Sequence, residues 1–272
     1  MDLRPLDGMS AIVTGGGRGL GRAMALGLAR AGARVIATAA REATELEAVE
    51  LAARAYPGEP VVLPMLADVT AERDCDRVVQ AALERFGRLD ILVNNAGRGM
   101  KYVDENFMDG AARFWNAPVP AWRLIMDVNV NGSFLMARCA TPVMMRAGWG
   151  RIVNISMNHE TMRRPGFSPY GPSKAALESA TLIWAQELDG TGVTVNALLP
   201  GGASRTGMIP DKVPEQVRAR LLDPAIMVPP LLWLASREAD GCTGRRLVAS
   251  RWRTDLGGME AAEQAMESAG WP

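Results

Sequence analysis

A strand, a glycine-rich turn and a helix follow one another directly near the start of the chain. Residues 9–13 suit a short buried strand, 14–21 read Thr-Gly-Gly-Gly-Arg-Gly-Leu-Gly, and 22–31 have helical spacing. Glycines let the backbone approach a pyrophosphate closely, and the following helix presents free N–H groups and the positive end of its dipole. This order predicts a nucleotide-binding loop, and the alternative is a tight structural turn.

Strand-like and helix-like segments alternate along the rest of the chain. Short apolar runs predict strands at 34–38, 61–66, 89–93, 151–155, 192–198 and 246–249. Segments with helical spacing separate them, at 42–55, 71–86, 121–147, 214–222 and 226–235 and in the stretch that begins at Tyr170. This alternation predicts an α/β fold, a doubly wound parallel sheet with helices on both faces and ligands at the carboxyl ends of its strands.

The end of the second strand indicates which dinucleotide such a fold would take. An acidic residue there binds a ribose 2′-hydroxyl, whereas a cation accommodates a 2′-phosphate. The chain has no acidic residue between Asp7 and Glu42, and it offers Thr38 and Arg41, with Arg18 from the glycine turn. These residues favour NADP(H) over NAD(H), although Arg41 also suits a solvated helix start.

Composition narrows the class of partner. The 272 residues, 48% of them hydrophobic, can bury a substantial core, and 1–272 is expected to be a single domain. Lys plus Arg and Asp plus Glu number 30 each, so no net field favours nucleic acid or an anionic membrane. The apolar runs are far shorter than the about 18 residues of a membrane span, and 1–5 lack the apolar stretch of a signal peptide. We expect a cytoplasmic protein with a small-molecule ligand.

The cysteines and the histidine exclude several kinds of site. Cys75, Cys139 and Cys242 are odd in number, widely spaced and without a histidine cluster, which argues against a disulfide framework and a zinc site. Buried free thiols are the better interpretation, and no metal is expected. His159 is the only histidine, so a Ser-His-Asp triad would have to be built around it.

Tyr170 and Lys174 stand four residues apart where a helix is expected to begin. That spacing puts both side chains on one helical face, and Pro172 is compatible with a first helical turn. A nearby cation favours the phenolate form of a tyrosine, so the two residues could form a proton-transfer pair. The alternative is a surface tyrosine beside a solvated lysine.

Three stretches interrupt the regular alternation. Residues 98–120 are irregular and rich in aromatic residues, which suits a lid over the substrate, a packing insertion or an assembly surface. Residues 203–230 are rich in proline and are interpreted as a mobile substrate flap. From 251 onward the chain turns polar and is expected to dock on a neighbouring subunit or to fray.

Taken together, the motifs resemble those of the short-chain dehydrogenase/reductase family over roughly Leu6 to Ala249. They occur in the family's order and at its spacing: Thr14-Gly15-x-x-x-Gly19-x-Gly21, Asp68-Val69, Asn94-Asn95-Ala96-Gly97, Asn129, Tyr170-x-x-x-Lys174, and Pro200-Gly201 with Thr206. Chance agreement of so many motifs is negligible. The resemblance implies a Rossmann-like sheet of seven parallel strands and hydride transfer between a nicotinamide and a carbonyl or alcohol carbon.

The resemblance also implies a role for individual residues. Tyr170 is expected to protonate the developing alkoxide, and Lys174 to lower the tyrosine pKa and hold the nicotinamide ribose. Asn129 is expected to link Lys174 to a water chain that resupplies the proton. Asp68 is expected to meet the adenine, and Asn95 and Gly97 to flank the adenosine ribose. The cofactor is expected to lie against Gly15, Arg18, Gly19, Leu20, Gly21, Thr38, Arg41, Asp68, Val69, Asn95, Ala96, Gly97, Tyr170, Lys174, Pro200, Gly201 and Thr206.

One departure from the family pattern bears on the chemistry. The family usually places a serine thirteen residues before its tyrosine, to donate a hydrogen bond to the substrate oxygen, and here that position is Met157. Ser156 is one residue short, and Asn158 and His159 follow directly. The chain is therefore interpreted as a carbonyl reductase with a displaced donor, an imine reductase, or an NADP-binding sensor or scaffold with little turnover.

The remaining expectations concern the substrate and the assembly. The pocket is expected to be walled by Met157, Asn158, His159 and Phe167 with the 98–120 and 203–230 stretches, and its apolar character favours a hydrophobic carbonyl or alcohol. The resemblance implies a homodimer or homotetramer. A second departure, at 248–251 where relatives carry an Asp-Gly-Gly turn, bears on the mode of assembly.

Overall fold

A computed structural model describes residues 4–56, 61–109, 112–210 and 213–270. Parts of the predicted insertion (110–111), flap (211–212) and tail (271–272) lie outside these ranges. The strands are β1 (Ser10–Val13), β2 (Arg34–Ala39), β3 (Val62–Leu66), β4 (Ile91–Asn94), β5 (Gly150–Ile155), β6 (Val193–Leu199), β7 (Arg245–Val248) and β8 (Met266–Ser268). The α-helices are α1 (Gly19–Arg30), α2 (Ala43–Arg54), α3 (Glu72–Phe86), α4 (Val119–Met126), α5 (Gly132–Ala147), α6 (His159–Met162), α7 (Tyr170–Glu187), α8 (Glu215–Arg218), α9 (Val228–Ala235) and α10 (Gly258–Ala265).

The described strands form one sheet in the order β3-β2-β1-β4-β5-β6-β7-β8. Neighbours from β3 to β7 pair in parallel, so the predicted doubly wound, Rossmann-like architecture is confirmed. The predicted strand count of seven is wrong, because β8 adds an antiparallel edge strand beside β7. The chain order reverses between β1 and β4, which is where such sheets open a crevice for ligands.

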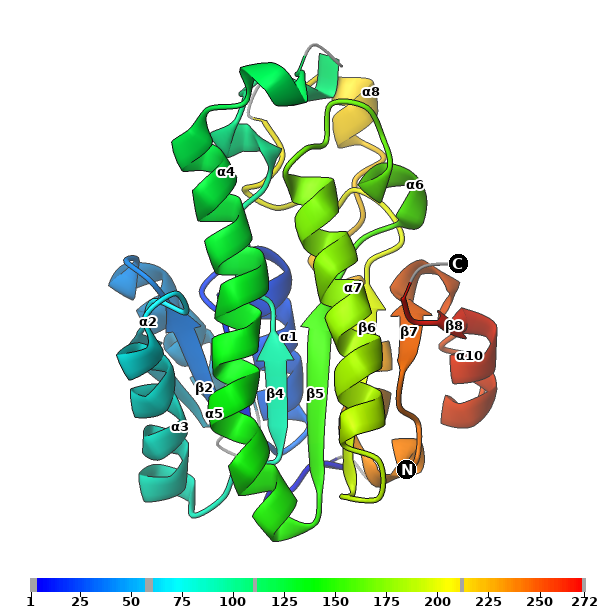
Figure 1. The fold of residues 1–272 in the computed structure, drawn as a ribbon. Coiled ribbons are helices and arrows are strands. Elements are labelled where there is room, and N and C mark those ends of the chain that lie inside the picture. Colours follow the sequence, from blue (N-terminus) through cyan, green and yellow to red (C-terminus); the bar gives the residue numbers. More distant parts are fainter. Residues whose placement is uncertain (1–3, 57–60, 110–111, 211–212, 271–272) are drawn as a thin grey trace.

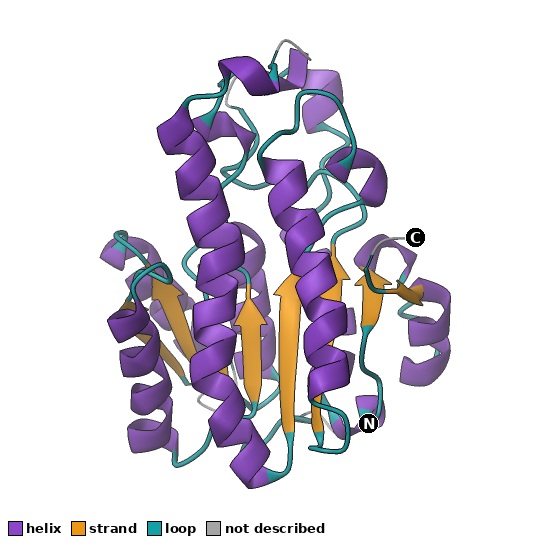
Figure 2. Cartoon of the chain, viewed as in Figure 1, coloured by secondary structure: helices purple, strands orange, loops and turns teal. Residues whose placement is uncertain are grey.

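Helices cover both faces of the sheet (Figures 1 and 2). Along β4, Ile91 and Val93 pack into one apolar core with residues of α1, α2 and α9, whereas Leu92 packs into the other with residues of α3, α5 and α7. Successive side chains of a strand point to opposite faces, so a strand buried on both faces needs apolar residues at consecutive positions. This explains why the strand segments read as short continuous apolar runs.

A single helix was predicted over 121–147, and the structure divides that stretch into three parts. It begins earlier, as α4 at Val119, passes through a π-helical turn at Asp127–Asn131 and continues as α5. Single π turns inside α-helices are often found at functional sites, and this one carries Asn129. Residue spacing alone does not show a π turn, because only one residue is added to one turn.

The two irregular stretches are only partly helical. The insertion forms 3₁₀ turns at Met100–Tyr102, Phe107–Asp109 and Phe114–Asn116, and Met100, Phe107 and Ala112 make a small apolar core to which Phe167 and Tyr170 are added. The helix predicted at 214–222 is only the single turn α8. A bridge between Ser204 and Leu222 ties the two ends of that stretch together.

The tail from 251 neither frays nor extends away from its own subunit over its described residues. After a 3₁₀ turn at Ala249–Arg251, the chain forms α10 and returns as β8, which pairs with β7 from Leu247↔Met266 to Arg245↔Ser268. Ala262 of α10 belongs to the main core. The small alanines of α10 are what allow this helix to pack closely despite its polar exposed side.

The structure describes the state of the cysteines and the character of the helices. All three cysteines are free thiols, but only Cys75 is buried, whereas Cys139 and Cys242 are half-buried. Burial raises the pKa of the Cys75 thiol to about 12, which makes it a poor nucleophile at neutral pH. No helix within the described ranges combines the length and the apolar character that crossing a membrane requires.

The turn between α7 and β6 provides a matched test of this packing. Gly190 and Gly192 both have left-handed φ, but a Cβ at 190 meets nothing within 4 Å, whereas one at 192 would lie 2.1 Å from the Gly148 carbonyl oxygen. We expect Gly190→Ala to lower the free energy of unfolding by about 1 kcal/mol. Gly192→Ala should cost about 2 kcal/mol more, because the backbone at Gly148 must move. Urea unfolding followed by circular dichroism measures both, and equal losses would show that the close approach is not rigid.

Candidate functional site

The predicted site residues gather at the carboxyl edge of the parallel strands. The glycine turn follows β1, Asp68 follows β3, Asn95 follows β4, Ser156 follows β5 and Pro200 follows β6. In Figure 1 these strand ends point the same way, toward the half of the molecule that holds the insertion and α6. The topology therefore brings together residues that are far apart in the sequence.

The glycine turn is braced from β4. The Thr14 hydroxyl oxygen accepts hydrogen bonds from the Asn95 and Ala96 backbone N–H groups at 3.0 and 2.9 Å. The Asn95 side-chain amide donates in return to the carbonyls of Thr14 and Gly15, at 2.8 and 3.0 Å. The described contacts of Asn95 thus fix the shape of the turn, and its predicted contact with the adenosine ribose stays a prediction.

The turn leaves a cradle that only glycine permits. A Cβ at Gly21 would lie 2.1 Å from the Gly15 carbonyl oxygen and 2.5 Å from the Asn95 amide nitrogen. The helix α1 then begins with no side-chain cap from Arg18 and no acidic residue in its first turn. Free N–H groups and a positive helix end without a resident carboxylate fit the pyrophosphate of a dinucleotide. Gly19 lies against Thr206, since a Cβ there would approach the Thr206 Cγ2 to 3.0 Å, so the loop after β6 reaches the same cradle.

That loop is itself anchored to the end of the sheet. The Pro200 carbonyl accepts a hydrogen bond from the Ser250 N–H at 3.1 Å, and a Cβ at Gly201 would overlap the Ser250 hydroxyl. The residues at 248–251, which depart from the family pattern, therefore lie directly behind Pro200 and Gly201.

The end of β2 carries the residues predicted to select the cofactor. Thr38 is buried, and its carbonyl accepts a hydrogen bond from the Gly16 N–H at 2.8 Å. Arg41 is exposed, and the Arg18 guanidinium lies 3.4 Å from the Glu45 carboxylate of α2. Sequence reasoning missed Glu45, because a helical acid gives no sign that it faces the glycine turn.

Asp68 and Val69 lie between β3 and α3 and do not cap that helix. The Asp68 carboxylate accepts hydrogen bonds from the N–H and hydroxyl of Thr70, which closes a local turn, and α3 begins at Glu72 without a side-chain cap. Asp74 instead reaches back to the Asp68 N–H at 2.8 Å. Val69 packs against α5, since a Cβ at Gly132 would lie 2.6 Å from it. Asp68 thus has a fixed backbone at the expected adenine position.

Tyr170 and Lys174 lie in the first turns of α7, as predicted. Lys174 is buried, and its ammonium donates a 2.7 Å hydrogen bond to the Ile155 carbonyl at the end of β5 while lying 6.0 Å from the centroid of the Tyr170 ring. Burial lowers the pKa of Lys174 to about 8, and the Glu178 carboxylate opposes that shift. Burial raises the pKa of Tyr170 to about 12.

The pKa of Tyr170 is thus raised overall, because burial outweighs the lowering expected from the charge of Lys174. Burial disfavours the charged form of each group, which raises the pKa of a phenol and lowers that of an ammonium. The Lys174 ammonium donates a hydrogen bond to the Ile155 carbonyl, and burial is the cause of the raised pKa of Tyr170. At neutral pH the phenol holds its proton.

Asn129 holds the start of α7 to the loop after β4. Its side chain is fully buried, accepts a hydrogen bond from the Arg98 N–H at 2.7 Å, and donates to the Arg98 carbonyl and the Ser173 hydroxyl at 3.0 and 2.9 Å. Ser173 donates in turn to the Tyr170 carbonyl at 2.7 Å. Asn129 is thus joined to Tyr170 through Ser173, and Gly97 passes close beside it.

The segment after β5 holds Met157 and the residues beside it that could replace the family's serine as a hydrogen-bond donor. Ser156 is buried, and within the described residues its hydroxyl has no hydrogen-bond partner. Met157 is also buried, and the Asn158 side-chain amide donates to the Gly201 carbonyl at 3.1 Å. A buried hydroxyl with unused hydrogen-bonding capacity is costly unless a further partner binds there, so Ser156 is the candidate donor at this position.

His159 and Phe167 flank this segment in different ways. Burial and the neighbouring Arg246 lower the pKa of His159, so the imidazole is neutral at physiological pH. Phe167 meets Phe107 of the insertion edge to face, with ring centroids 5.7 Å apart, and both belong to the small core that includes Tyr170. The insertion is therefore packed against the residues that precede the catalytic helix.

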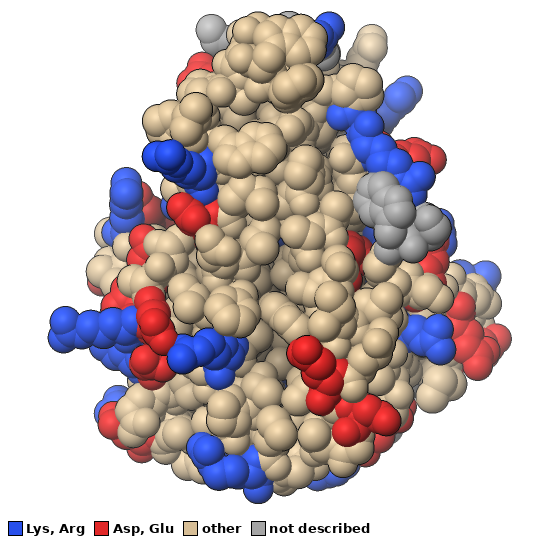
Figure 3. Space-filling view, viewed as in Figure 1, with Lys and Arg blue, Asp and Glu red and all other residues tan. Residues whose placement is uncertain are grey.

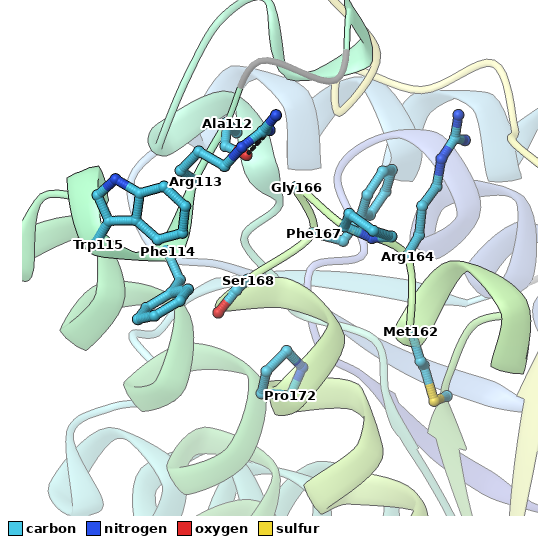
Figure 4. Close-up of a pocket in the computed structure, with 11 residues that line it drawn as sticks. Ala112, Arg113, Phe114, Trp115, Met162, Arg164, Gly166, Phe167, Ser168 and Pro172 are labelled. Carbon is cyan, nitrogen blue, oxygen red and sulfur yellow. Dashed lines mark hydrogen bonds between the residues drawn. The ribbon is translucent and has the colours of Figure 1, made fainter.

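A cavity of about 480 Å³ opens beside the start of α7 (Figure 4). Phe114 and Trp115 lie on one side of it, and Phe167, Ser168 and Pro172 line the other. Of the predicted pocket residues, Phe167 lines this cavity and Met157, Asn158 and His159 do not. A second cavity, of about 410 Å³, lies within the predicted flap, between Arg205 and Leu221.

Sequence reasoning also missed a buried cluster of charges behind the site. Arg246 of β7 contacts Glu178 of α7, Glu267 of β8 and the carbonyl of Met157. Glu178 stands four residues after Lys174 in an apolar stretch of helix, and Arg246 directly precedes the apolar residues of its strand. A charge inside an apolar run needs a partner, so the two positions could have been flagged, but nothing in the sequence pairs them.

Comparisons with known proteins agree with this geometry. Residues 9–216 match the family model described as short chain dehydrogenase. The chain is 32% identical over 247 residues to the short chain dehydrogenase mpl6 of Monascus purpureus, covering 89% of this chain and 81% of that protein. It is 33% identical over 221 residues to an NADPH-dependent aldehyde reductase-like protein of Arabidopsis thaliana, covering 78% and 79%.

A solved structure gives the same result at the level of the fold. A putative short-chain dehydrogenase/reductase from Burkholderia xenovorans superposes with a TM-score of 0.78 at 31% identity, covering 89% of this chain and 95% of that one. With the matched family model, the sheet order and the Tyr170 and Lys174 geometry, these likenesses show that the chain belongs to the short-chain dehydrogenase/reductase family of oxidoreductases.

Proposed function

We propose that the chain is an NADP(H)-preferring oxidoreductase that interconverts a carbonyl and an alcohol, with Tyr170 as the general acid and base. The observation that carries this proposal is the pair at the start of α7, a half-buried phenol that keeps its proton and a buried ammonium held by the Ile155 carbonyl, at the sheet edge that also holds the glycine cradle. The bound nicotinamide would supply or accept the hydride. The protein orients the reactants and handles the proton.

The raised pKa of Tyr170 suits the direction of reduction. A phenol that keeps its proton at neutral pH can give it to the oxygen of a carbonyl as that oxygen becomes an alkoxide. Lys174 places a positive charge close to the phenol, where it stabilises the phenolate left behind, and Asn129 is proposed to connect this pair to a resupplying water chain. Ser156 is proposed to donate the hydrogen bond to the substrate oxygen that the family assigns to the residue at Met157.

The proposed preference for NADP(H) rests on the end of β2. Arg18 and Arg41 supply cations and Thr38 a hydroxyl, and the chain offers no acid at this strand end. Glu45 partly neutralises Arg18 at 3.4 Å, so a 2′-phosphate would compete with a carboxylate for that guanidinium. A relative whose name describes it as NADPH-dependent supports the same choice.

The proposed substrate is an apolar to moderately polar carbonyl or alcohol. Phe114, Trp115 and Phe167 surround the cavity beside α7, and Met157 is buried next to the proposed donor. Arg113, Arg164 and Ser168 add polar groups to the lining of this cavity. Aromatic walls with a few polar groups favour a mainly hydrophobic ligand.

A homo-oligomer, dimer or tetramer, is proposed as the working state. Phe134 and Met145 of α5 and Ile183 of α7 are large apolar residues that are 46 to 50% exposed. Figure 3 shows a largely uncharged area over the upper parts of α5 and α7, with acidic and basic side chains lower down on the same face. Large exposed apolar patches of this kind typically mark protein–protein contacts.

The first test replaces the proton donor. Tyr170→Phe removes one hydroxyl, and we expect carbonyl reduction to fall by about 10² to 10⁴-fold with little change in NADPH binding. NADPH consumption is followed against a panel of ketones, aldehydes, quinones and cyclic imines. Met157→Ser in the same panel shows whether a serine at the family position speeds the reaction. If the wild type binds NADPH but consumes it only after that change, the chain is a sensor or scaffold rather than a reductase.

The pH dependence of reduction should report Lys174. The ammonium is present below its pKa of about 8 and is lost as the pH rises through that value, while Tyr170, with a pKa of about 12, stays protonated. We therefore expect kcat/KM for carbonyl reduction to be level below the lysine pKa and to fall above it. Lys174→Arg, which keeps its charge, should be slower but should lose this fall. A wild-type profile that stays level to high pH would rule out a charge on Lys174 as the requirement.

Cofactor preference is tested with a pair of opposite substitutions. Arg41→Ala should weaken NADPH binding much more than NADH binding, by about tenfold or more, because only NADPH carries the 2′-phosphate. Glu45→Gln should strengthen NADPH binding, because it frees Arg18. Dissociation constants from cofactor fluorescence measure both, and equal effects of Arg41→Ala on the two cofactors would refute the assignment.

A further inference from the structure

Arg246 makes three charged or polar contacts from the middle of β7. Its Nε donates to the Glu178 carboxylate at 3.1 Å, its Nη1 to the Glu267 carboxylate at 2.6 Å, and its Nη2 to the Met157 carbonyl at 2.8 Å. Its side chain is only 3% exposed. The flat guanidinium is the one side chain that can donate in three directions at fixed angles while staying charged.

The two carboxylates come from different parts of the fold. Glu178 of α7 is 1% exposed, and its second oxygen accepts a hydrogen bond from the Gly270 N–H at 3.3 Å. Glu267 of β8 also pairs with Arg251. The cluster thus holds two guanidinium groups and two carboxylates. Glu178 alone offsets the charge of Arg246, and Glu267 of β8 meets a second side of the same guanidinium.

This cluster fixes the segment proposed to hold the hydrogen-bond donor. The Ser156 N–H donates to the Leu198 carbonyl at 2.9 Å, the Met157 carbonyl accepts from Arg246, and the Asn158 amide donates to the Gly201 carbonyl. The first and third of these contacts come from β6 and the loop after it. Only the contact to Met157 comes from the carboxy-terminal part of the chain.

A planar guanidinium is held at a fixed angle only while acceptors meet it on more than one side. Loss of one acceptor lets the group rotate about the acceptors that remain, or lets water enter. When Glu267 is lost, Arg246 has one buried carboxylate left and an open path toward solvent on the side of β8. Its third contact, to Met157, is then free to shift.

We infer that Arg246, clamped between Glu178 and Glu267, is a positioning residue that holds the Ser156–Asn158 segment in place through the Met157 carbonyl. The carboxy-terminal strand β8 thereby contributes to the geometry of the active site, through Glu267, as well as extending the sheet. This inference rests on the proposed function for the role of the segment, but the contacts themselves do not depend on it.

Two substitutions and two matched controls test the inference. Arg246→Lys keeps a cation between the carboxylates but lacks the planar fork needed to reach three acceptors. Glu267→Gln keeps the shape of the β8 side chain and removes its charge. The controls are Arg245→Lys, the exposed neighbour on the same strand, and Glu263→Gln, an exposed acid of α10.

The first readout needs no substrate. Hydrogen exchange of the cofactor-free proteins, read by mass spectrometry on peptides that cover 156–162, should be at least severalfold faster in Arg246→Lys and Glu267→Gln than in the wild type and both controls. Thermal unfolding establishes that each variant is folded at the temperature used. Should Arg246→Lys fail to fold, Glu267→Gln, whose site is 32% exposed, decides alone. Faster exchange confined to β7 and β8 would overturn the inference.

The second readout separates positioning from mere stability. With a carbonyl that the wild type reduces, both test variants should lose about ten- to a hundredfold in kcat, as misplaced active-site groups do, with NADPH dissociation constants within about twofold of the wild type. An unchanged kcat in a variant with a lowered melting temperature would show that the cluster only stabilises the fold. If the wild type reduces no carbonyl, the proposed function fails, and the exchange measurement still decides whether the cluster holds the segment.

Discussion

The direction of the parallel strands is the constraint on which the rest of the structure depends. Because β1 to β7 run the same way and the chain order reverses between β1 and β4, the loops after these strands converge on one edge. The helices can then serve two purposes at once. They bury the two apolar faces of the sheet, and two of them, α1 and α7, present their amino-terminal turns to that edge. The glycine cradle and the tyrosine–lysine pair therefore lie at the same edge of the sheet, although they are far apart in the sequence.

Burial at this edge shifts the pKa values on which the proposed proton transfer depends, and it also makes the charged lysine costly to hold there. The same loss of water that raises the pKa of Tyr170 lowers that of Lys174, so a protonated phenol lies beside an ammonium close to losing its charge. A lysine this deeply buried needs an acceptor, which is the last carbonyl of β5, and a carboxylate within reach of its field, which is Glu178. Glu178 needs a counter-charge in turn, and Arg246 provides it. The buried charges behind the site therefore follow from the placement of Lys174.

Sequence patterns predicted the elements that depend on local composition and spacing. They did not predict the contacts that depend on residues far apart in the chain. The glycine turn, the parallel sheet and the start of α7 at Tyr170 follow from short-range composition and spacing. The strand β8 has three residues without an apolar alternation, and it forms because β7 offers an unpaired edge and Arg246 a donor for Glu267. A spacing of four residues also shows that a cation is near Tyr170, but it does not show that burial outweighs that cation and raises the tyrosine pKa. Likewise, Glu45 faces Arg18 only because α2 folds back beside the turn.

Position 157 connects a departure visible in the sequence with a contact visible only in the structure. A serine there would carry its own donor on a side chain that can rotate to meet the substrate. With Met157 the donor must come from a neighbour, and Ser156 directly follows the last residue of β5, where its direction is set by the backbone. A donor aimed by the backbone is only as well placed as that backbone is rigid. The hydrogen bond from Arg246 to the Met157 carbonyl supplies rigidity at the residue that lost its hydroxyl, so the departure from the family motif and the charged clamp from the carboxy-terminal strand form one arrangement.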